Sequence, residues 1–100
     1  MEPRKMSFIV DGKRYRTEGA DLVASDVYSD GTTTERVGRN TFLFRTNKGN
    51  YFMQHQTTWA REQDCLTPLA RDEAFRVFIE LPTKMLDYEE AFPGAKIEDA

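Results

Sequence analysis

The chain has 100 residues, 39% hydrophobic and 31% charged, with a formal net charge of -3. This length fits one small domain with a thin core and excludes a large buried active-site cavity. One Cys and one His are too few for an internal disulfide framework or a structural zinc site, so we expect no metal and no cofactor. Apolar runs reach three residues, as at 8–10 and 77–79, so we expect no membrane span, no signal-peptide core and a cytoplasmic protein.

Charge is distributed unevenly along the chain. Residues 1–61 hold ten Lys or Arg and seven acidic residues, a balance of +3, whereas residues 62–100 hold four and ten, a balance of -6. Such a chain can offer a basic face to polyanions and an acidic face to basic proteins, or it can simply be well solvated.

The N-terminal residues predict a β-hairpin. Segments 7–10 and 13–16 flank Asp11-Gly12, a pair that accepts the positive φ angles of a two-residue turn. The turn sets the register, which places Phe8 opposite Tyr15 on one face. We expect that face to pack inward.

The next residues predict a helix followed by a loop. Thr17 is a candidate N-cap, and the apolar residues after it recur at one-face helical spacing: Ala20, Val23, Ala24 and Val27. Residues 28–40 combine turn formers with few apolar anchors, which predicts a long loop.

The middle of the chain predicts a second hairpin and an edge strand. Aromatic segments 41–46 and 51–55 flank a loop in which Gly49 suits a left-handed position. Residues 65–69 are a candidate edge strand, because Pro68 has no N–H for a central ladder.

Two further helices complete the prediction. Apolar spacing predicts a helix from Ala70 to Leu81 that ends at Pro82, and another from Thr83 that ends at Pro93-Gly94. The sequence therefore predicts an α+β domain over residues 1–94: an antiparallel sheet of two hairpins and an edge strand, covered by three short helices. Residues 95–100 are expected to be a flexible tail.

The periodicities also predict a core. Its members face inward in the predicted strands and helices. They are Phe8, Val10, Tyr15, Val23, Val27, Leu43, Phe52, Leu66, Ala74, Val77, Phe78 and Leu81.

Four short motifs along the chain are similar to those of a known group of proteins. They are Asp11-Gly12-Lys13-Arg14-Tyr15-Arg16-Thr17-Glu18 with Ala20, Leu43-Phe44-Arg45-Thr46-Asn47-Lys48-Gly49-Asn50-Tyr51-Phe52, Pro68-Leu69 with Glu73-Ala74, and Tyr88-Glu89-Glu90. With these motifs the chain resembles short uncharacterised bacterial proteins found near mobile elements and phage genes. The resemblance implies association with a mobile element and names no activity.

Catalytic residue types are scarce. His55, Asp64 and Cys65 are the residue types of a thiol-dependent enzyme, in which an imidazole takes the thiol proton and a carboxylate orients the ring. A lone Cys is more often a small packed residue and a lone His a solvated one, so we expect no enzyme. No glycine-rich phosphate loop is present.

The best candidate site is a basic, aromatic surface on the two hairpins and the loop between them. Its members are Arg14, Arg16, Arg36, Arg39, Arg45, Lys48 and Tyr51. Guanidinium groups beside aromatic rings suit single-stranded nucleic acid, with cations on phosphates and rings under bases. The alternative is that the rings are sheet packing and the Arg stems cover it.

A non-catalytic module that binds another protein is the leading hypothesis. An edge strand, the 28–40 loop or the acidic end formed by Asp87, Glu89 and Glu90 offers the surface for such a partner. Nucleic-acid binding is the alternative, and a thiol-dependent enzyme comes last.

Overall fold

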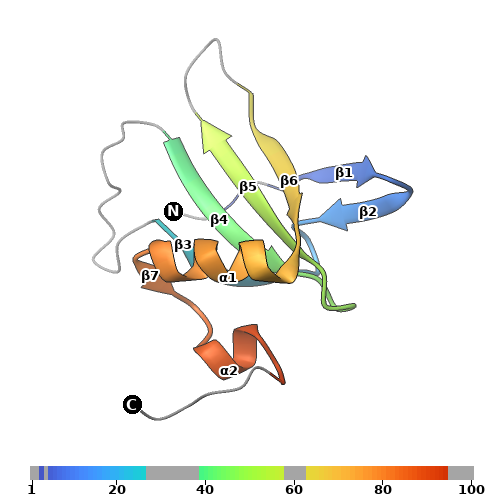
Figure 1. Cartoon of the computed structure of the whole chain (residues 1–100). Coiled ribbons are helices and arrows are strands. Elements are labelled where there is room, and N and C mark those ends of the chain that lie inside the picture. The colour runs from blue at the N-terminus through green and yellow to red at the C-terminus, as the bar shows by residue number, and fades with distance from the viewer. Residues whose placement is uncertain (1–2, 4, 27–38, 58–62, 95–100) are drawn as a thin grey trace, which may run out of the picture.

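The computed structural model describes residues 3, 5–26, 39–57 and 63–94. Within these residues the chain forms seven strands and two helices (Figure 1). The strands are β1 (Ser7–Val10), β2 (Lys13–Arg16), β3 (Asp21–Ser25), β4 (Arg39–Arg45), β5 (Tyr51–Thr57), β6 (Cys65–Leu69) and β7 (Thr83–Lys84), and the helices are α1 (Arg71–Glu80) and α2 (Tyr88–Ala91). The α+β class is confirmed, although the described fold is mostly sheet.

Five strands form one antiparallel sheet in the order β6-β5-β4-β3-β7. The predicted β4–β5 hairpin is confirmed, with Gly49 at a φ of +86°. Both strands are longer than expected: β4 begins at Arg39 rather than at Thr41, and β5 continues past His55 to Thr57. The predicted strand at 65–69 is also confirmed, at the edge of the sheet next to β5.

The β1–β2 hairpin is confirmed with the predicted register, Phe8 opposite Tyr15. Asp11 and Gly12 both have positive φ, at +52° and +76°, as a two-residue primed turn requires. Tyr15 is buried as expected, but the expectation for Phe8 is wrong, because its side chain is 39% exposed.

The predicted helix after Thr17 is wrong, because these residues form strand β3. A register shift between Leu22 and Ala24 breaks the strict alternation of the strand. Val23 and Ala24 therefore join the same hydrophobic cluster although they are adjacent, a pattern that resembles helical spacing. Thr17 instead holds the base of the hairpin, since its Oγ1 accepts from the N–H of Met6 at 2.9 Å.

The third predicted helix is shortened to α2, because strand β7 takes the place of its first two residues. Since β3 replaces the helix predicted after Thr17, the described residues hold two helices rather than three. Thr83 and Lys84 pair with β3, and the N–H groups of Met85 and Leu86 then donate to the carbonyl of Val23. Helix α2 begins later because Asp87 caps it, accepting from the N–H of Glu90 at 2.9 Å.

Helix α1 agrees with its predicted position. The Glu73 carboxylate accepts from the N–H of Ala70 at 2.9 Å, which closes the first turn. Pro82 follows the C-cap Leu81 and ends the helix. Figure 1 shows α1 lying across one face of the sheet, with α2 beyond it.

The two faces of the sheet hold separate hydrophobic clusters. Beneath α1 and α2 lie Val23, Ala24, Leu43, Tyr51, Ala74, Phe78, Leu81, Ala91 and Phe92. On the opposite face, against the β1–β2 hairpin, lie Tyr15, Phe42, Phe44, Phe52 and Leu66. Most of the predicted core is therefore buried, while Val10 and Val77 are half-buried.

Three predictions fall on residues outside the described ranges. These are the burial of Val27, most of the 28–40 loop, and the flexible tail at 95–100. The domain boundary at residue 94 stays a prediction for the same reason.

Candidate binding groove

A groove of about 520 Å³ separates the β1–β2 hairpin from the β4–β5 turn. One wall consists of Gly12 and all four residues of β2, and the other of residues 46–48 and 50. Residues 18–20, which connect β2 to β3, also line it. The groove therefore lies between two turns that are distant in the sequence.

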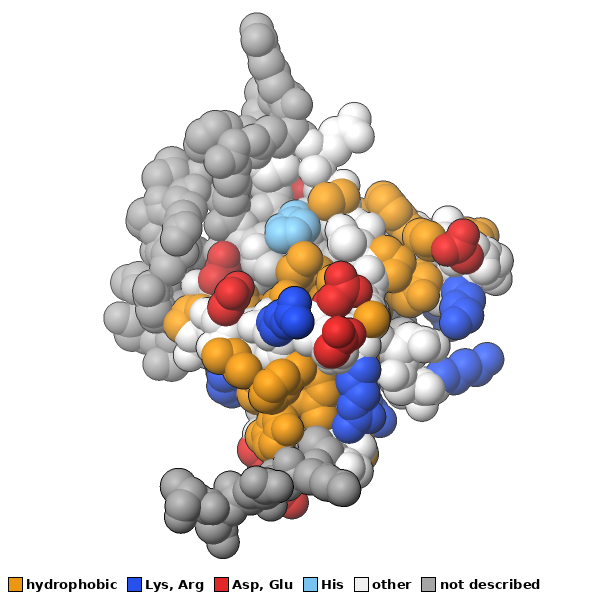
Figure 2. Space-filling model, in the orientation of Figure 1, with side chains coloured by type: hydrophobic (Ala, Val, Ile, Leu, Met, Phe, Trp, Pro, Cys, Tyr) orange, Lys and Arg blue, Asp and Glu red, His pale blue; other side chains and the backbone are white. Residues whose placement is uncertain are grey.

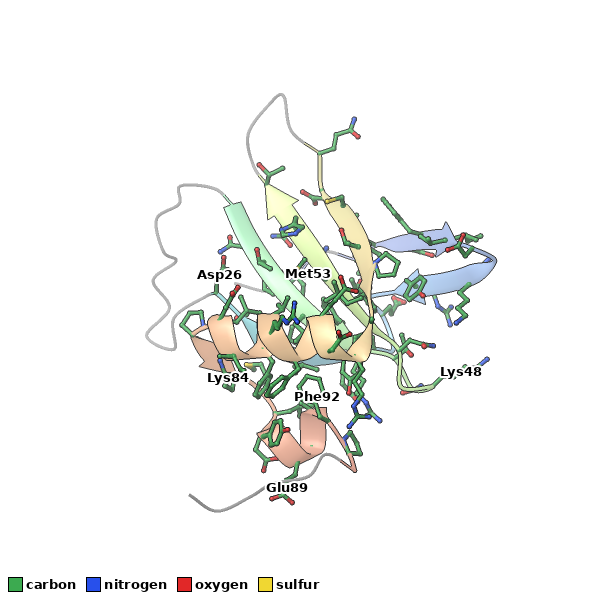
Figure 3. The ribbon with its side chains drawn as sticks, viewed as in Figure 1. Asp26, Lys48, Met53, Lys84, Glu89 and Phe92 are labelled. Carbon is green, nitrogen blue, oxygen red and sulfur yellow. The ribbon has the colours of Figure 1, made fainter. Side chains whose placement is uncertain are left out.

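Local hydrogen bonds fix the far wall. Thr46 closes the β4–β5 turn, because its N–H donates to the carbonyl of Asn50 at 2.8 Å and its Oγ1 accepts from the N–H of Asn50 at 3.1 Å. The N–H of Gly49 donates to the carbonyl of Thr46 at 2.9 Å. These bonds hold Lys48 at the exposed tip of the turn (Figure 3).

The charges that line the groove are mainly positive. Four exposed cations line it: Lys13, Arg14, Arg16 and Lys48. The one lining carboxylate, that of Glu18, lies 3.6 Å from the ammonium of Lys5. Among the described residues, no side chain forms a hydrogen bond or ion pair with any of the four cations. Figure 2 shows basic side chains over the hairpin and over the β4–β5 turn.

The structure brings together three of the seven residues predicted for the site: Arg14, Arg16 and Lys48. Arg45 ends β4 and is half-buried, with its Nε enclosed and without a hydrogen-bond partner among the described residues. Arg39 begins β4, about 20 Å from the groove end of that strand. Arg36 lies outside the described residues.

The aromatic rings near the groove belong to the core. Tyr51 is 3% exposed, stacks on Phe92 with ring centroids 5.0 Å apart, and donates its hydroxyl to the carbonyl of Ala91. Tyr15 and Phe44 both pack against the buried Phe52, at centroid distances of 5.8 and 5.1 Å. None of these rings offers an open face on which a base could stack.

Two of the three residues predicted for a thiol-dependent enzyme are paired in the sheet, and the third precedes β6. His55 and Cys65 are cross-strand neighbours on β5 and β6. The ring Nδ1 of His55 is 3.3 Å from the hydroxyl oxygen of Thr41, and the Asp64 carboxylate accepts from the N–H of Thr57 at 2.8 Å. Asp64 therefore binds backbone rather than orienting the imidazole. The described residues hold no group of three or more potential metal ligands.

Sequence reasoning missed the walls that make the groove concave. Gly19 and Ala20 lie in the segment for which the sequence predicts a helix, and Asn47 and Asn50 are not among the predicted site residues. The signal in the sequence is Gly19 itself, because glycine commonly marks a turn that needs a positive φ, and its φ in the structure is +87°.

A second hollow of about 410 Å³ lies between α1 and α2, lined by Arg71, Asp72, Phe75, Tyr88 and Phe92. Its cation is already engaged, because Nη2 of Arg71 donates to the carbonyl of Pro93 at 2.8 Å. The guanidinium also lies 5.9 Å from the centre of the Phe92 ring. The basic groove is therefore the stronger candidate site.

Comparison with known proteins adds no assignment: no family model, no curated protein and no solved structure matches the chain. In the described ranges, no helix has the length and apolar character needed to cross a membrane.

Proposed function

We propose that the protein is a small non-catalytic module that binds another protein, and that its groove accepts an acidic segment of that partner. The observation that carries the proposal is the set of four exposed cations around one groove, with no described side chain neutralising them. Carboxylates placed against Arg and Lys form charge-assisted hydrogen bonds, which are stronger than neutral ones.

A protein partner is favoured over a single-stranded nucleic acid. Stacking on aromatic rings supplies much of the affinity in such nucleic-acid sites, and the rings near this groove are buried.

We further propose that the protein acts in the cytoplasm as an accessory module of a bacterial mobile element. Its motif resemblance to short proteins found near such elements supports this setting. The groove supports a regulatory contact rather than a reaction, because it pairs cations with turn residues and holds neither His nor Cys.

The test uses a fluorescent peptide of about ten residues in which Glu and Val alternate, with binding followed by anisotropy. We expect the wild-type protein to bind it, more weakly as salt rises toward about 0.15 M. The double reversal Arg14→Glu and Lys48→Glu should weaken binding about 10-fold or more. Arg76→Glu is the matched control, because Arg76 is exposed on α1 and outside the groove, and it should change affinity less than about 2-fold.

Two outcomes would overturn the proposal. The first is no binding of the acidic peptide even at low salt, or binding that the double reversal leaves unchanged. The second is submicromolar binding of an oligothymidylate at about 0.15 M salt, lost on the same reversal, which would identify a nucleic-acid site.

A further inference from the structure

One edge of the β1–β2 hairpin is open, and its register tells which backbone groups face outward. In a hairpin closed by a two-residue turn, the flanking residues Val10 and Lys13 exchange hydrogen bonds, and bonded pairs then alternate along the ladder. The bond from the N–H of Thr17 to the carbonyl of Met6, at 3.0 Å, continues this alternation. The N–H and C=O groups of Arg14 therefore point away from β1, and so do those of Arg16.

This open edge faces the groove. All four β2 residues line it, and the β4–β5 turn stands opposite. In the described part of the chain, β2 pairs with β1 alone. No other described residue is bonded to the outward backbone groups of Arg14 or Arg16. Arg14 and Arg16, which the sequence predicts for the site, thus each present a guanidinium group and an unbonded N–H and C=O pair to the groove.

The edges of the large sheet are protected differently. β6 carries Pro68, which has no N–H to donate, and β7 is two residues long. The edge of β2 instead carries Lys13, Arg14 and Arg16. Such an edge repels another basic strand, including β2 of a second copy, and attracts an acidic one.

We propose that the acidic segment of the partner binds in extended conformation as a third strand, antiparallel to β2. This inference rests on the proposed function and specifies how that groove recognises its ligand. The added strand lies about 4.8 Å from β2. Residues directly opposite Arg14 and Arg16 exchange backbone hydrogen bonds with them and place acidic side chains on the same face as the guanidinium groups.

The alternating Glu-Val peptide allows a matched chemical test. In the proposed register the Glu residues lie opposite Arg14 and Arg16, so their own N–H groups donate to β2 and those of the Val residues point outward. A peptide N-methylated at the Glu amides should lose about 10-fold or more in affinity. The same peptide N-methylated at the Val amides keeps its charge and should bind within about 3-fold of the unmodified peptide.

Amide hydrogen exchange gives an independent readout. Binding of the unmodified peptide should slow exchange at Arg14 and Arg16. It should leave Lys13 and Tyr15 nearly unchanged, because their N–H groups already bond to β1.

Failure of this inference differs from failure of the proposed function. Equal affinity of all three peptides, with sensitivity to the Arg14→Glu and Lys48→Glu reversal intact, would mean that charge alone holds the segment and would overturn the strand. A loss confined to the Val-methylated peptide would overturn the antiparallel register. Absence of binding by the unmodified peptide would overturn the proposed function itself.

Discussion

The helical face and the hairpin face of the sheet use the same residue types in opposite ways. Against the helices, the Arg71 guanidinium binds the carbonyl of Pro93, and the Lys84 ammonium binds those of Ile79 and Leu81. At the hairpin, the cations of Arg14 and Arg16 have no partner among the described side chains. Cations on one side therefore stabilise the fold, whereas we propose that the cations on the other side bind the ligand.

Aromatic packing shows the same contrast. Phe92 is 2% exposed and contacts the rings of Tyr51, Phe75, Phe78 and Tyr88. The hairpin buries Tyr15 against Phe52, but it leaves Phe8 and Ile9 of β1 39% and 65% exposed. We expect stability to depend mainly on the helical face, and binding on the hairpin.

The largest expected effect is that of Phe92→Ala. Removing a buried ring leaves a cavity among its four neighbours and should lower the free energy of unfolding by about 3 to 5 kcal/mol in a urea titration. Ile9→Ala is the control on the hairpin, where a side chain that is 65% exposed should cost less than about 1 kcal/mol. Similar losses at the two positions would remove the contrast between the faces.

Tyr51→Phe should have an intermediate effect. The ring stays, but the carbonyl of Ala91 loses its buried donor, so the free energy of unfolding should fall by about 1 to 2 kcal/mol. Binding of the acidic peptide should not change, because the hydroxyl faces α2 rather than the groove. Weaker binding at unchanged stability would instead assign Tyr51 to the binding surface.

The smallest expected effect is a pH dependence from Lys84. Partial burial lowers its pKa below the ordinary value of 10.5, so in the window between the two values the unfolded chain binds the proton more tightly. The free energy of unfolding should therefore rise with pH in that window, relative to the same curve for Lys84→Met. If the free energy of unfolding of the wild type relative to Lys84→Met stays constant up to pH 10.5, or falls as the pH rises, this expectation is contradicted.

The sequence predicted elements whose signals are local and missed those that depend on distant partners. The β4–β5 hairpin and α1 follow from their own turn, strand and capping residues. Strand β3 was not predicted because its bulge gives the apolar residues a helix-like spacing. Strand β7 was not predicted because it depends on pairing with β3, about sixty residues earlier in the chain, which a short sequence window does not contain.

The candidate site was predictable to a similar extent. Arg14, Arg16 and Lys48 were selected because two hairpins carry them, and those hairpins form from local sequence. The sequence also predicts Tyr51 for this surface, but residues about forty positions later bury it: Phe92 stacks on its ring, and the carbonyl of Ala91 accepts a hydrogen bond from its hydroxyl. The open backbone edge follows from the register of a hairpin whose turn the sequence does specify.

The pairing of β3 with β7 also bears on the order in which the chain folds. Ala24 pairs with Lys84, so this contact closes a loop that contains β4, β5, β6 and α1. Closing a loop of that length carries an entropy cost before any contact compensates it. We expect the β4–β5 hairpin, joined by a short turn, to form early and β7 to dock last, so that β3 remains an unprotected edge on the ribosome until residue 84 has emerged.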